Sequence, residues 1–172
     1  MKKIEPHFLA ILFALPVLTG CQTVNSALTP ATQVTTDDFD GSKVVRQEPV
    51  SSSNSLTEDW HTLGFDWTSR TPDKVFLTIG VHGINNIFGL EFNVGGRTIS
   101  APSASMTTEL GPWSTRRFVV SYGEFATIAS APMVKMKVSG ANTYGVSSFG
   151  TATDALVGKK FPAFLEQVQA AR

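Results

Sequence analysis

The chain of 172 residues carries 14 basic and 14 acidic residues, and its formal net charge is zero at pH 7. This balance argues against an electrostatic nucleic-acid binder, which concentrates lysine and arginine on one face. The single cysteine excludes an internal disulfide, so a folded domain has to be stabilised by its hydrophobic core.

The first residues have the pattern of an export signal. Lys2 and Lys3 precede an apolar run over residues 8–18, and small residues follow before Cys21. A positive start, a short apolar segment and small residues at a boundary are the three parts of such a signal. As a helix the apolar run would be roughly 16 Å long, against about 30 Å for the hydrocarbon layer. It is too short for a permanent membrane span, and we expect residues 1–20 to be a cleaved signal peptide.

The four residues Leu18-Thr19-Gly20-Cys21 resemble the lipobox of bacterial lipoproteins. The resemblance implies that the Cys21 sulfur receives a diacylglyceryl group, that cleavage occurs between Gly20 and Cys21, and that the new amino terminus is acylated. Several acyl chains make membrane residence stable, whereas one chain is marginal. In this class aspartate after the cysteine favours the inner membrane. Gln22 therefore points to the periplasmic side of the outer membrane, with the inner membrane as the alternative.

Residues 21–36 are expected to form the lipidated amino terminus and a flexible tether. The segment is rich in Thr, Ser, Ala and Pro, and no period of 2 or 3.6 persists in it. Residues 37–172 are enough for one periplasmic domain with a sizeable core, and no change in composition divides them. Removal of residues 1–20 takes away two lysines and one glutamate, which leaves a net charge of −1.

The first strands of this domain are predicted from alternating apolar and polar residues. Val44 and Val45 indicate an initial strand before the loop SSSNS. Residues 61–67 and 75–81 each place their apolar residues on one face, as half-buried strands do. The Pro-containing turn between these two segments predicts an antiparallel hairpin.

A second hairpin is predicted around Gly95-Gly96. Residues 88–94 alternate, with an apolar face that starts at Phe88. Two adjacent glycines supply the positive-φ positions of a tight hairpin turn. Such a turn sets Phe92 opposite Ile99, with one dry face and one polar face.

Three further strands and two helices complete the prediction. Strands are expected at residues 117–122, 134–138 and 143–149, and a short helix within 121–132 that Pro132 ends. An amphipathic helix is expected at residues 161–171, because Phe161, Phe164, Leu165 and Val168 fall at i, i+3, i+4 and i+7. The predicted fold is mainly β, a β-sandwich or bent antiparallel sheet with a C-terminal α-helix; an α+β arrangement is the alternative.

The densest polar cluster is TEDWH, which contains Glu58, Asp59 and His61. An imidazole beside a carboxylate can move protons near neutral pH, so His61 with Glu58 or Asp59 is a candidate acid–base couple. The competing interpretation is a histidine that is simply hydrogen-bonded at the rim of a buried face.

His82 would be needed to extend this cluster into a metal site. His61 has the strand parity of the apolar residues that follow it, whereas His82 has the opposite parity. The two histidines should therefore face apart unless Gly64 or Gly80 marks a bulge that resets the alternation. We expect no metal site.

The tryptophans and a pair of adjacent arginines are the other residues that a binding site could use. Trp60 and Trp113, with Trp67, could line a ligand groove, although core or rim packing is the commoner use of tryptophan. Arg116 and Arg117 are adjacent in a strand, so they project to opposite faces and cannot form one anion clamp.

No serine-hydrolase elbow and no phosphate-binding loop occurs in the sequence. The functional hypothesis is a lipid-anchored envelope lipoprotein with a non-enzymatic binding or structural role. Its expected partners are the membrane, through the anchor, and another envelope protein. No cofactor is expected, and the only attached group is the covalent lipid on Cys21. The alternative hypothesis is a periplasmic enzyme acting on a cell-wall or lipid substrate with His61 and one of the two carboxylates.

Overall fold

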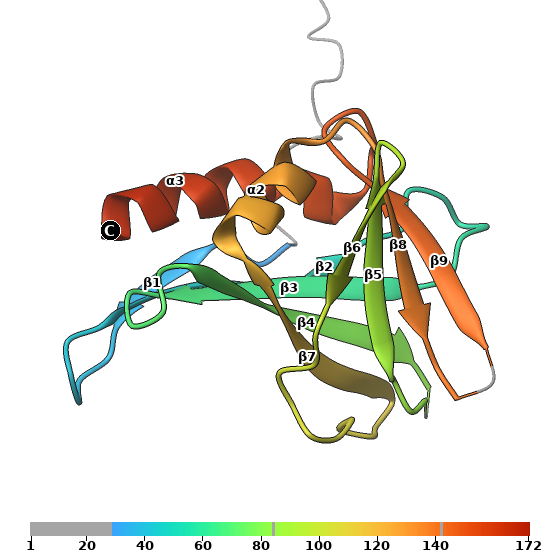
Figure 1. The fold of residues 1–172 in the computed structure, drawn as a ribbon, viewed down its shortest axis with the longest axis horizontal. Helices are drawn as coiled ribbons and strands as arrows, with labels where there is room; N and C mark the ends of the chain where they lie inside the picture. Colours follow the sequence, from blue (N-terminus) through green and yellow to red (C-terminus); the bar gives the residue numbers. More distant parts are fainter. Residues whose placement is uncertain (1–28, 84, 142) are drawn as a thin grey trace, which may run out of the picture.

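The structure is a computed structural model that describes residues 29–83, 85–141 and 143–172. Nine strands within these residues form two antiparallel sheets (Figure 1). One sheet contains, in order, β1 (Gln33–Thr36), β2 (Lys43–Ser51), β3 (His61–Thr68), β4 (Lys74–His82) and β7 (Trp113–Ser121). The other contains β6 (Arg97–Ala101), β5 (Gly89–Val94), β8 (Val134–Ser139) and β9 (Tyr144–Phe149). The predicted mainly β fold with a C-terminal helix is confirmed.

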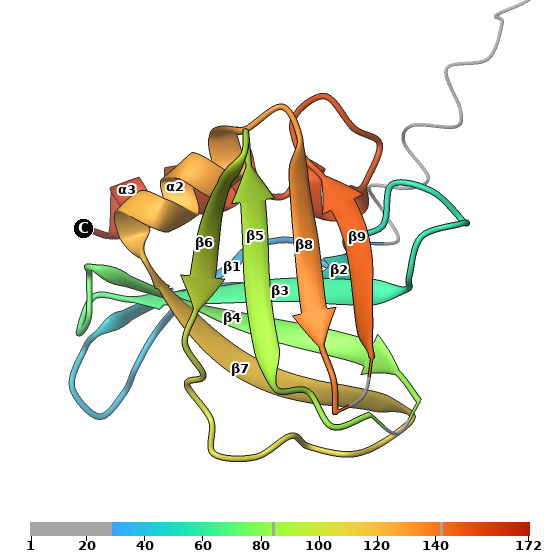
Figure 2. The same cartoon turned by 45° about the vertical axis from the view of Figure 1, so that its right-hand side comes forward.

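Two helices and the second sheet share the inner face of the five-stranded sheet. The helices are α2 (Tyr122–Ser130) and α3 (Phe161–Ala171), and a short 3-10 helix, η1 (Leu156–Lys159), precedes α3. Figures 1 and 2 show the four-stranded sheet across one end of the five-stranded sheet and the helices over the other end. Helix α2 begins with a capping box, in which Ser121 and Glu124 satisfy each other's backbone N–H groups.

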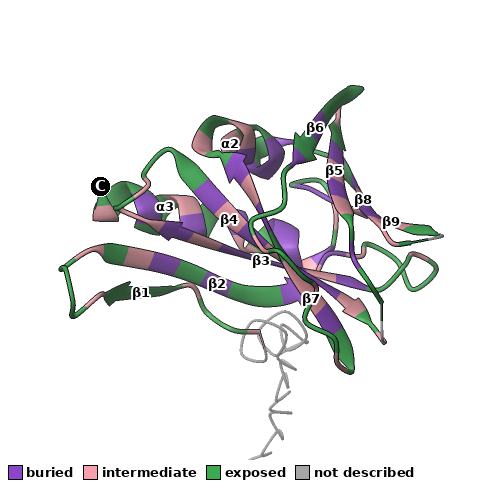
Figure 3. Cartoon of the chain, turned by 60° about the horizontal axis from the view of Figure 1, so that its bottom comes forward, coloured by how far each residue is buried: buried purple, intermediate pink, exposed green. Residues whose placement is uncertain are grey.

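The core joins these layers through aromatic side chains. The Phe65 ring centroid on β3 lies 5.2 Å from that of Phe125 on α2. It lies 5.1 Å and 4.7 Å from those of Phe161 and Phe164 on α3. All four side chains are buried, and Figure 3 shows buried positions alternating with exposed ones along the strands. The helices are therefore held on the sheet chiefly by apolar packing.

Both predicted hairpins form, and the second has the predicted register. Phe92 pairs with Ile99, and Gly95 and Gly96 have φ of 58° and 90° in the turn. Strands β3 and β4 pair without a register shift, so neither glycine of this pair resets the alternation. A bulge lies instead in β2, between Gln47 and Val50.

Several element boundaries differ from the prediction. Residues 33–36, expected within the tether, form the edge strand β1 by pairing with β2. Phe88 precedes β5 and is exposed, so the buried face of that strand starts at Leu90. Strand β7 starts at Trp113, four residues earlier than expected, and Tyr122 belongs to α2.

The signal peptide, the lipobox with Cys21, and Gln22 lie outside the described residues. Among the residues that are described, no helix has the length and apolar character needed to cross a membrane.

Candidate functional site

Strand ends from both sheets meet at one end of the sandwich. His82 at the end of β4 pairs with Trp113 at the start of β7, and Ser139 at the end of β8 pairs with Tyr144 at the start of β9. The described residues of the loops 52–60, 83–88, 102–112 and 140–143 therefore lie at this end, which we call the open end. Figure 2 shows three of these loops below the second sheet and loop 52–60 at the right.

Large apolar side chains are exposed at the open end. Among the described residues, seven of the ten exposed large hydrophobic side chains belong to its loops and strand starts: Leu56, Trp60, Phe88, Met106, Leu110, Trp113 and Tyr144. Isolated exposed apolar residues are ordinary on protein surfaces, whereas a gathering from separate loops is typical of a binding surface.

A pocket of about 250 Å³, the end pocket, opens between the two sheets at the open end. Its polar walls come mainly from loops, and two aromatic side chains flank them. Its lining includes Trp60, His82, Asn85, Asn86, Thr143 and Tyr144. Amide, hydroxyl and imidazole groups beside aromatic rings can hydrogen-bond and stack on a neutral ligand.

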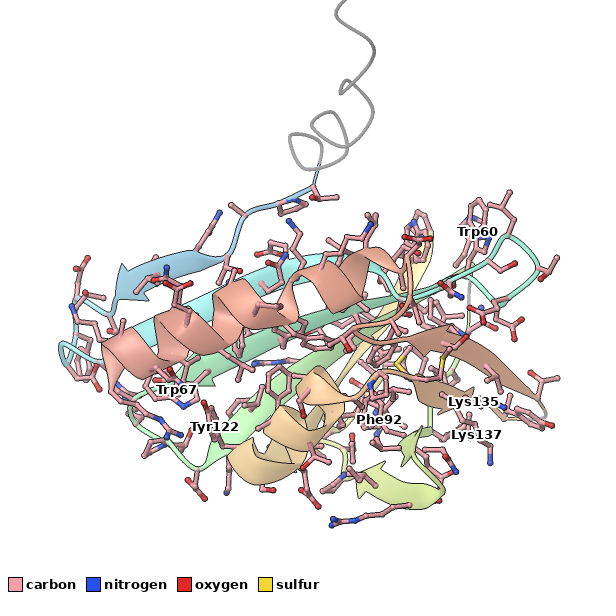
Figure 4. The ribbon with its side chains drawn as sticks, turned by 90° about the horizontal axis from the view of Figure 1, so that it is seen from above. Trp60, Trp67, Phe92, Tyr122, Lys135 and Lys137 are labelled. Carbon is pink, nitrogen blue, oxygen red and sulfur yellow. The ribbon has the colours of Figure 1, made fainter. Side chains whose placement is uncertain are left out.

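A second hollow, of about 440 Å³, lies beside the end pocket, and we call it the tryptophan groove. Trp60, Trp113 and Leu56 line it, and Trp113 also makes an edge-to-face contact with His82, with ring centroids 5.4 Å apart. Trp67 is not part of it, because this side chain is buried in the core and donates from Nε1 to the Pro72 carbonyl at 3.2 Å. Figure 4 shows Trp60 and Trp67 at opposite ends of the molecule.

Glu58 and Asp59 bind the edge of the second sheet. The Asp59 carboxylate accepts the backbone N–H of Val146 at 2.8 Å, and the Glu58 carboxylate accepts that of Ser148 at 3.1 Å. Partial burial raises the pKa of Glu58, but hydrogen bonds from Ser148 and the Asn54 backbone outweigh it and hold the pKa below its ordinary value. The two carboxylates cover N–H groups of β9, an edge strand that would otherwise invite pairing with another chain.

His61 belongs to a buried polar network that joins the two sheets. Its Nδ1 lies 3.3 Å from the hydroxyl of Ser147 on β9, which lies 3.2 Å from the hydroxyl of Ser52. The backbone of Gly145 lies against the imidazole, because a Cβ built there would be 2.7 Å from Nε2. The His61 backbone N–H donates to the Asp59 carbonyl at 3.0 Å. Within the described residues, no hydrogen bond joins the His61 imidazole to the carboxylate of Glu58 or Asp59.

The two histidines have different environments, as the strand register predicts. His61 is 4% exposed and shares a face with Val81, whereas His82 is exposed beside Trp113. Both nevertheless border the end pocket. Among the described residues, no group of three or more His, Cys, Asp or Glu side chains is placed to hold a metal ion.

Burial of His61 predicts a pH-dependent stability. Burial lowers the pKa of His61 below its ordinary value, and the nearby Asp59 charge offsets this only in part. The unfolded chain therefore binds a proton before the folded chain does, and stability falls as pH drops below about 6.5. The free energy of unfolding, measured with urea, should decrease between about pH 7.5 and about pH 5.5.

The His61→Asn variant should flatten this dependence, because an amide can replace the Nδ1 contact without titrating. His82→Asn is the matched control, since its ring is exposed, and it should retain the wild-type slope. If the unfolding free energy of His61→Asn fell with pH as steeply as that of the wild type, His61 would not be the source of the pH dependence.

Arg116 fixes two loops of the open end, a role the sequence did not indicate. Its guanidinium donates to the carbonyl of Ile87 and, at 3.0 Å, to the hydroxyl of Ser103. Arg117 instead donates to Asp66 at 3.0 Å, so the adjacent arginines do project to different surroundings. The end-pocket residues of loops 83–88 and 140–143 were also not predicted, because loops lack a periodic signal.

Comparison of the chain with protein-family models, curated proteins and solved structures finds no match.

Proposed function

We propose that the protein is a lipid-anchored envelope lipoprotein of the outer membrane with a non-enzymatic binding role. Cys21 carries the lipid, and the open end contacts the ligand or partner. The observation that supports this role is the gathering of exposed apolar side chains around the end pocket, supplied by several loops. Loops on a rigid β scaffold are a common location for binding residues.

The contacts of the polar cluster favour binding over catalysis. Glu58 and Asp59 accept backbone N–H groups of β9, and His61 is enclosed with Ser147. The alternative, a periplasmic enzyme, would require His61 to exchange protons with one of these carboxylates. Their hydrogen bonds serve the sheet edge instead, and among the described residues neither carboxylate is hydrogen-bonded to the imidazole.

The ligand of the end pocket is a neutral envelope component with hydrogen-bonding groups. Asn85, Asn86 and Thr143 supply amide and hydroxyl groups, and Tyr144 supplies an exposed ring. The four loops of the open end contain no lysine or arginine, so they offer no basic side chain to an anionic partner.

Photo-cross-linking in intact cells tests the binding role. Tyr144 is replaced by p-benzoylphenylalanine, a conservative change at the mouth of the end pocket, and adducts are identified by mass spectrometry. Phe39 is the matched control, since it is 91% exposed in the turn between β1 and β2, at the far end of β2. We expect an adduct from position 144 that is absent from position 39. Identical products from both positions, or none from 144, would argue against binding at the open end.

A further inference from the structure

The tryptophan groove is an exposed apolar surface whose occupant has to be explained. Leu56 is 88% exposed, Trp60 61% and Trp113 41%. The three side chains come from loop 52–60 and the start of β7, and they line one hollow. Leaving this much apolar surface in water is unfavourable, so its retention indicates contact with an apolar surface.

The charges around the groove restrict the kind of surface that fits. The loops of the open end contain three charged residues, Glu58, Asp59 and Glu109, and all of them are acidic. Two of the three carboxylates bind backbone N–H groups of β9. Without cations the groove has no electrostatic attraction for anionic lipids, so attachment would depend on apolar insertion. Tryptophan suits this because its ring is apolar and its N–H can hydrogen-bond at a membrane–water interface.

The position of the chain start brings this surface near the anchor. Gln47 on β2 donates from Nε2 to the Pro30 carbonyl at 3.2 Å, which fixes the beginning of the described chain beside β2. Strand β2 then ends at Ser51, roughly 13 Å further along at about 3.3 Å per residue, and continues into loop 52–60.

The length of chain before this point limits the distance to the bilayer. Eight peptide units separate Cys21 from Thr29, so they span at most about 30 Å whatever their arrangement. A lipid on Cys21 therefore keeps the groove within reach of the membrane. Tethering also raises the effective concentration of the bilayer, so a weak contact is sufficient for docking.

We propose that the tryptophan groove docks on the surface of the bilayer that holds the lipid on Cys21. Leu56, Trp60 and Trp113 enter the headgroup region, and the inference rests on the lipid anchor of the proposed function. The opposite end of β2 lies equally far from Gln47, but its turn over residues 37–42 exposes Phe39 beside three aspartates and does not gather three apolar side chains in one hollow.

Quenching of tryptophan fluorescence by brominated lipid tests this proposal. The full lipidated protein is reconstituted in phosphatidylcholine vesicles with or without bromine on the acyl chains. The chain has three tryptophans, and Trp67, which is 1% exposed, serves as an internal reference. We expect brominated vesicles to reduce the emission of the wild-type protein. The double variant Trp60→Phe/Trp113→Phe, which retains Trp67, should lose this difference.

The results of this experiment test the docking of the groove and the lipid anchor separately. A protein that floats with vesicles but shows equal emission in brominated and unbrominated lipid is anchored and does not dock, which overturns this inference and leaves the proposed function. Quenching that persists in the double variant also overturns it, since Trp67 would then be the quenched residue. A protein that does not float at all overturns the anchor and the docking together.

Discussion

The Phe65→Ala variant should lose about 3–5 kcal/mol of unfolding free energy. Phe65 is buried where β3 meets both helices, with its ring against Phe125, Phe161 and Phe164. Truncation removes apolar contacts to three rings at once and leaves a cavity that two helices and a sheet cannot all move to fill. Urea unfolding followed by circular dichroism measures the loss.

Phe39→Ala is the matched control, because the same truncation at an exposed position should change the free energy by less than about 0.5 kcal/mol. Equal effects of the two substitutions would mean that the helices do not depend on the aromatic cluster for their position.

The Cys21→Ser variant should abolish the lipid anchor completely. The serine hydroxyl is a far weaker nucleophile than a thiolate, so the diacylglyceryl group is not transferred and the signal is not removed. Metabolic labelling with a radioactive fatty acid should give no labelled protein, and immunoblotting should show the longer precursor.

The Gln22→Asp variant tests which membrane holds the lipidated protein. It should retain the lipid label and move the protein from the outer to the inner membrane fraction, as the resemblance to lipoproteins implies. A mature, membrane-bound Cys21→Ser protein would contradict the lipobox hypothesis.

The parts of the fold that were predicted are those with local signals. The hairpin of β5 and β6 follows from alternation on both sides of Gly95-Gly96, and α3 follows from apolar residues at helical spacing. Strand β1 was missed because its residues carry no alternation of their own and are ordered by pairing with β2. Phe88 was predicted to lie on the buried face of β5 because it continues the apolar alternation, but the strand starts one residue later, at Gly89.

The candidate site was less predictable because its contacts join distant parts of the chain. Trp60 and Trp113 were candidates, but their meeting depends on the pairing of β3, β4 and β7. Asp59 binds a residue that is 87 positions away in the chain and Glu58 one that is 90 positions away, which no local pattern indicates. Their role at the edge of β9 required the order of strands in the second sheet.

Loop 52–60 has a further consequence if both proposals hold. Trp60 and His61 border both the end pocket and the tryptophan groove. If an occupant of one hollow displaces these shared residues, the shape of the other hollow changes as well. Under both proposals the bilayer and the ligand are then thermodynamically linked, and each changes the affinity for the other by the same factor.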